Sequence, residues 1–99
     1  MKDEFITRVG VWGQRHYNYL KKHFTTVINV MRMNGTLEQY IKYIDKDAKD
    51  MFDKLVKQLA DSEGINEELK SANEIDWIRS MNSIRNRAEE IVLSEVIYN

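Results

Sequence analysis

The chain has 99 residues, of which 42% are hydrophobic and 31% charged, a balance typical of folded proteins and not of disordered chains. It contains no cysteine, which excludes disulfides, thiolate metal sites and cysteine nucleophiles. The formal net charge of −1 hides an uneven distribution, because residues 5–37 carry five cations and no acid, whereas residues 38–76 carry eleven acids and six lysines. We expect one domain over residues 1–99, with residues 1–9 as a flexible N-terminal extension.

The hydropathy of the sequence argues against a membrane-spanning protein. No apolar stretch reaches the roughly 18 residues that a membrane span requires, and the first residues lack the apolar core of a secretory signal. We therefore expect a cytoplasmic protein that does not bind membranes. The chain has no proline and only four glycines, which favours long helices.

The first predicted helix begins near Gly10 and ends at Asn34 and Gly35, which are typical of a turn. Its apolar residues keep helical spacing from Tyr17 to Met31. The β-branched residues within this segment lower its helix propensity, so a strand at residues 24–31 is the alternative.

The second predicted helix covers residues 36–63, where apolar residues recur at steps of three and four. Thr36 and Gln39 have the spacing of a capping box at its start, and Gly64 provides a left-handed stop after its end. The third predicted helix runs from Glu74 to about Tyr98 and is capped by Asn73. These elements predict an all-α fold, a three-helix bundle with long helices and a short fourth helix in the 64–73 connection.

The residues that could bind a metal or catalyse a reaction lack the necessary spacing. His16 and His23 are seven residues apart, about 10.5 Å along a helix, so one metal ion cannot bridge them and we expect a surface or interfacial role for both. The acids of residues 45–61 alternate with lysines four residues away, which indicates a solvated helix face. No phosphate-binding loop or nucleophile elbow is present. We therefore expect no catalytic, cofactor-binding or metal-binding residues, and no enzymatic activity.

Residues 12–23 differ from the rest of the chain, because cations and aromatic residues alternate there without an acid. This pattern is typical of a surface that contacts phosphates, and it makes Arg8, Arg15, Lys21 and Lys22 the candidate nucleic-acid-binding residues. An equally weighted alternative is that this basic helix docks on the acidic helix that follows it.

The C-terminal run WIRSMNSIRNRAEEIVL at residues 77–93, followed by EVIY at 95–98, resembles the signature of the TnpV family. The segment ADSEGI at 60–65, with Leu69 and Lys70, and the pattern from Gly13 to His23 are also similar to this family. Members are small proteins encoded by transposons and related mobile elements of Firmicutes. The resemblance covers residues 9–99 and implies an accessory protein of a mobile element that assists excision or integration through DNA or a recombinase.

A second hypothesis is a protein-interaction module, such as an inhibitor of a host defence nuclease. In that case the acidic second helix, with Asp50 and Asp53, would occupy the groove of a basic protein partner. Homodimerisation is a further expectation, because long helices in a short chain leave part of an apolar stripe uncovered.

Overall fold

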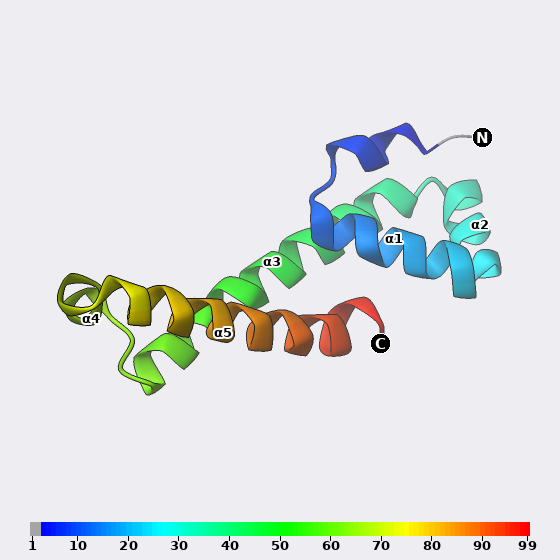
Figure 1. The fold of residues 1–99 in the computed structure, drawn as a ribbon. Helices are drawn as coiled ribbons and strands as arrows, with labels where there is room; N and C mark the ends of the chain where they lie inside the picture. Colours follow the sequence, from blue (N-terminus) through cyan, green and yellow to red (C-terminus); the bar gives the residue numbers. More distant parts are fainter. Residues whose placement is uncertain (1–2) are drawn as a thin grey trace.

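The computed structural model describes residues 3–99, which contain five α-helices and no strand. A 3₁₀ helix, η1 (Glu4–Arg8), comes first, and a π-helical segment, η2 (Leu93–Ile97), comes last. Between them lie the five α-helices of Figure 1, α1 (Val11–His23), α2 (Thr25–Asn34), α3 (Leu37–Ser62), α4 (Glu67–Ala72) and α5 (Glu74–Val92). The predicted all-α fold is confirmed, and α4 is the short helix expected in the 64–73 connection.

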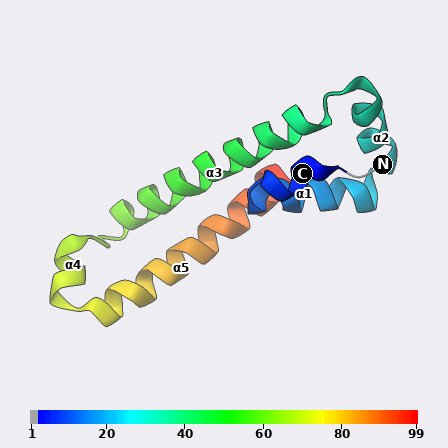
Figure 2. The same cartoon turned by 90° about the horizontal axis from the view of Figure 1, so that it is seen from above.

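The molecule is long and narrow, with extents of 55 × 23 × 17 Å. Helices α3 and α5 form an antiparallel hairpin that α4 closes at one end, while α1 and α2 lie at the other end (Figure 2). All fully buried side chains lie in residues 5–48 and 84–97, which we call the head. Residues 49–83 contain no fully buried side chain, and we call them the arm.

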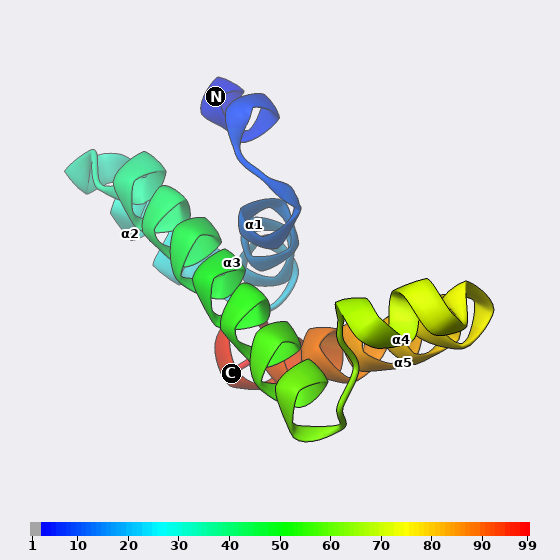
Figure 3. The ribbon, with the colours of Figure 1, turned by 90° about the vertical axis from the view of Figure 1, so that its left-hand side faces the viewer.

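Only in the head do three helices pack together as the predicted three-helix bundle, because α1 is much shorter than α3. Helix α1 has 13 residues and α3 has 26, so their lengths are about 20 and 39 Å. Both α1 and α5 lie beside α3 (Figure 3), but α1 packs along its first half. The contact of Trp12 with Phe52, whose ring centroids are 5.6 Å apart, lies at the start of the arm.

The first predicted helix is divided into α1 and α2 at Phe24, whose backbone leaves the helical region with φ −136° and ψ 54°. The Thr25 hydroxyl donates to the Lys21 carbonyl at 3.2 Å, a side-chain bond that competes with helix continuation. The chain nevertheless resumes a helix at Thr25, so the alternative of a strand at residues 24–31 is wrong.

Glycine and asparagine end and begin the helices as the sequence predicts. Gly35 and Gly64 have φ of 72° and 71°, and each closes the helix before it. The Asn73 side chain accepts a hydrogen bond from the Asp76 amide at the start of α5. The predicted capping box at Thr36 is wrong, because the hydroxyl of this residue points back to the Met31 carbonyl and caps no amide of α3.

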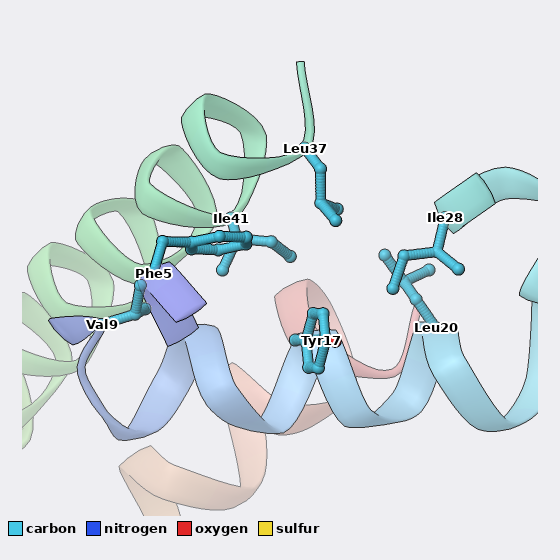
Figure 4. Close-up of a cluster of buried hydrophobic side chains, with 7 residues drawn as sticks. All are labelled: Phe5, Val9, Tyr17, Leu20, Ile28, Leu37 and Ile41. Carbon is cyan, nitrogen blue, oxygen red and sulfur yellow. The ribbon is translucent and has the colours of Figure 1, made fainter. Parts of the chain in front are cut away.

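Two apolar clusters hold the head together. One joins η1, α1, α2 and α3 through the seven residues drawn in Figure 4, which are Phe5, Val9, Tyr17, Leu20, Ile28, Leu37 and Ile41. The other joins α1, α3, α5 and η2 through Trp12, Ile44, Ala48, Val92 and Ile97. Burial of Phe5 and Val9 overturns the expectation of a flexible extension for residues 3–9, because each of these side chains is less than 8% exposed. Met1 and Lys2 lie outside the described residues.

Candidate nucleic-acid interface

The start of α1 approaches α3 closely because two glycines lie at the contact. A Cβ on Gly13 would be 2.2 Å from Val9 Cγ1 and 2.9 Å from the Cβ of Asp45. Asp45 uses this proximity to accept a hydrogen bond from the Gly13 amide at 2.9 Å, so α3 caps the N-terminus of α1. The sequence places Asp45 among ordinary surface acids, and only the folded chain brings it to an amide 32 residues earlier.

His16 joins three elements in the interior of the head and is only 4% exposed. Its Nδ1 lies 2.8 Å from the Ile97 carbonyl of η2, and its Nε2 lies 3.0 Å from the Tyr40 hydroxyl of α3. A carbonyl can only accept, so Nδ1 carries the proton and, in the neutral ring, Nε2 accepts from Tyr40. Of the expected surface or interfacial roles, His16 therefore lies at an internal interface between elements, whereas His23 is exposed.

A hydrogen-bonded group of three side chains fixes η1 against α1 and α2. The Arg32 guanidinium donates to both carboxylate oxygens of Asp3 at 2.6–3.0 Å, and the Tyr17 hydroxyl donates to the same carboxylate at 2.5 Å. The hydrogen bond from Arg32 is the main cause that lowers the pKa of Asp3 below its ordinary value. Burial and the hydrogen bond to Asp3 raise the pKa of Tyr17.

An open groove of about 990 Å³ lies between η1 and α1, and we call it the head groove. It contains two of the four candidate phosphate-binding residues, Arg8 from η1 and Lys21 from α1. Both are exposed, and neither forms an ion pair among residues 3–99. Among residues 3–99, the groove is lined by Asp3, Glu4, Ile6, Thr7, Arg8, Gln14, Tyr17, Asn18, Lys21 and Arg32.

The other two candidates lie outside this groove. Arg15 pairs with Glu89 of α5 at 3.0 Å, and its guanidinium carbon is 5.2 Å from the centre of the Trp12 ring. Its charge therefore pairs α1 with α5. Helix α1 also packs on α3, the acidic helix of the alternative, where the Gly13 amide donates to Asp45. Lys22 is exposed on α1 and does not line the groove. The structure thus brings together Arg8 and Lys21 but not the full set of four.

The acidic candidates lie on α3, and lysines one turn earlier balance both charges. Lys46 pairs with Asp50 at 2.8 Å, and Lys49 pairs with Asp53 at 2.9 Å. Asp50 borders a groove between α3 and the C-terminal part of the chain, whereas Asp53 borders a separate hollow beside Trp12. The first groove, the α3–α5 groove, is lined by Asp47, Asp50, Met51, Lys54, Leu55, Gln58, Ile91 and Glu95.

Within residues 3–99, no three His, Asp or Glu side chains are grouped so that they could hold a metal ion. Over the same residues, no helix combines the length and the apolar composition that a membrane span needs. The chemistry that these surfaces offer is therefore charge and hydrogen bonding, provided in the head groove by Arg8 and Lys21, the carboxylate of Glu4, the Asp3–Arg32 pair and neutral polar groups.

Comparison with known proteins identifies one family. The family model described as "Transposon-encoded protein TnpV" matches residues 1–97 of this chain. No curated protein and no solved structure matches significantly. The resemblance noted in the C-terminal run therefore extends over almost the whole chain and is confirmed.

Proposed function

Since the chain belongs to the TnpV family of transposon-encoded proteins, we propose that it is a non-enzymatic accessory protein that binds DNA phosphates through the head groove. The observation that carries this proposal is the pairing of Arg8 and Lys21 in one open groove. A protein of a mobile element acts in a process whose substrate is DNA, and a recombinase that works on the same DNA is a partner of that process.

The groove offers a phosphate backbone two cations and a side-chain amide, beside the carboxylate of Glu4. Its two cations come from different elements, and Asn18 adds an amide that can donate to a phosphate oxygen. Arg32 also lines the groove, but its charge is largely neutralised by Asp3. Two available cations favour sequence-independent binding of modest affinity, in which counterion release supplies most of the free energy.

The test measures fluorescence anisotropy of labelled duplex DNA titrated with the protein at two salt concentrations. With two phosphate contacts, affinity should fall about tenfold between roughly 50 and 200 mM salt. The double variant Arg8→Glu/Lys21→Glu should lose this binding. The control is Arg79→Glu/Arg85→Glu, which changes the net charge equally at two exposed arginines of α5 and should retain it. Equal loss in both variants, or no binding at low salt, would refute the proposal.

A second candidate function is inhibition of a host defence nuclease through the α3–α5 groove. The observation in its favour is that Asp47, Asp50 and Glu95 border a floor that includes Met51 and Leu55. Acids around an apolar floor suit a basic amphipathic segment of a partner. This arrangement favours Asp50 over Asp53 as the contact, because Asp53 borders a different hollow.

Charge reversal on α3 distinguishes the two functions, because it should affect nuclease inhibition and not DNA binding. Asp50→Lys should abolish inhibition of DNA cleavage by an RNA-guided nuclease, while Asp61→Lys, at an exposed paired acid of the same helix, should leave it intact. Neither substitution should weaken DNA binding by the head groove. Absence of inhibition by the unmodified protein would reject this candidate and leave the DNA-binding proposal unaffected.

A further inference from the structure

We infer that the arm is the interface of a homodimer, in which a second copy packs antiparallel along α3 and α5 and completes a four-helix layer. The inference concerns a different surface from the head groove and does not depend on DNA binding. Three observations carry it, namely the incomplete core of the arm, the excess of exposed surface and the distribution of charge along the molecule.

The core of the arm lacks the helix that closes the core of the head. In the head, α1 covers α3 and the central side chains Ile41, Ala48 and Ile84 are 0% exposed. Among the described residues of the arm, no helix takes the place of α1, and large apolar side chains remain half-buried. On α5, Ile75 and Ile78 are 66% and 45% exposed. A helix stripe of this kind is normally covered by another helix.

The chain as a whole exposes more area than a compact monomer, and the excess has the size that a dimer interface needs. Folded monomers of this mass expose about 5,900 Å², whereas this chain exposes 6930 Å². The excess, about 1,000 Å², is close to the roughly 800 Å² that each partner buries in a standard interface. The radius of gyration of 17.1 Å also exceeds the value of about 13 Å expected for a compact chain of this length.

The charge distribution favours a second copy of this chain as the partner, and it favours an antiparallel orientation. Residues 61–76, at the end of the arm, carry six acids and one lysine, while residues 3–37 at the other end carry five cations and two acids. These segments lie at opposite ends of the long axis (Figure 1). A parallel dimer would place like charges side by side, whereas an antiparallel dimer places each acidic end toward the basic head of its partner.

Sedimentation equilibrium of the full chain tests the inference directly. The unmodified protein should have twice the chain mass at about 100 μM. Ile78→Glu should weaken dimerisation at least tenfold, while Val30→Glu, at a head residue with a similar exposure of 48%, should not. Because Ile78 is exposed, circular dichroism should show an intact fold. A monomeric unmodified protein would overturn the inference and leave the arm to a different partner.

Single cysteines test the orientation, since the described chain has no cysteine of its own. In an antiparallel dimer the two copies of α4 lie at opposite ends, so Ser71→Cys should form no disulfide between copies under oxidation. Its efficient crosslinking would overturn the antiparallel arrangement. The dimer inference predicts nothing about DNA binding by Ile78→Glu. Failure of this inference and failure of the head-groove proposal are therefore distinguishable.

Discussion

The buried hydrogen bonds of His16 provide a quantitative test of how the head is held together. Replacement by alanine removes the bonds to Ile97 and Tyr40, together worth about 2 kcal/mol. It also leaves the Ile97 carbonyl without its partner and removes a ring that is only 4% exposed. With the resulting cavity, we expect His16→Ala to lower the free energy of unfolding by about 3–4 kcal/mol.

The assay is urea denaturation followed by circular dichroism. His23→Ala is the matched control, because His23 is exposed near the end of the same helix and should cost less than about 0.5 kcal/mol. Tyr40→Phe removes only one of the two bonds and should cost about 1 kcal/mol, with a coupling to His16→Ala of similar size. A cost for His16→Ala no greater than that of His23→Ala would refute the role assigned to the buried ring.

Three further predictions concern the contacts that position η1 and α1. Asp45→Ala should lower the free energy of unfolding by about 1 kcal/mol in urea denaturation, whereas Asp45→Asn keeps an acceptor for the Gly13 amide and should cost less. Gly13→Ala should lower the free energy of unfolding by about 3 kcal/mol and Gly35→Ala by about 1 kcal/mol. Of these two glycines, only Gly13 has atoms in the space that a Cβ would occupy. Equal thermal midpoints of the two variants would contradict this. Because Arg32 lowers the pKa of Asp3, this carboxylate should stabilise the fold at neutral pH, and its contribution should be lost as pH falls from about 4 through its folded pKa. The stabilities of the protein and of Asp3→Asn should therefore converge in acid, and a constant difference would contradict the assignment.

Apolar periodicity predicted the long helices well because it reports a local property. The stripes of α3 and α5 repeat at three and four residues over many turns, and the caps at Gly64 and Asn73 act within a few residues. The division of the first helix was missed because Phe24 fits the apolar spacing, although its backbone leaves the helical region. The hydroxyl of Thr25 bonds to the Lys21 carbonyl beside this break. The capping box at Thr36 failed for a similar reason, since its side chain had another acceptor within reach.

The contacts of the head could not be predicted, because they join residues that are distant in sequence. In the sequence, His16 and His23 are seven residues apart and lie on the same face of a helix. In the structure, His16 is buried and bonds to the carbonyl of Ile97, 81 residues later. A glycine within a helix is unfavourable when the helix is considered alone. Gly13 is needed because α3 packs so close to it that a Cβ would collide with neighbouring atoms. The basic segment is visible as a charge pattern in the sequence, whereas the pairing of Arg15 with Glu89 is visible only in the folded chain.

The two parts of the molecule therefore have different physical roles. Every fully buried side chain of residues 3–99 lies in the head, so stability should depend mainly on the head, where buried apolar area is greatest. The arm contributes length and half-buried apolar surface, which adds little to the stability of an isolated chain but favours association. Substitutions in the arm should consequently change assembly before they change folding, whereas substitutions at His16 or Gly13 should do the reverse. This separation is what allows the dimer interface and the head groove to be tested independently in the same protein.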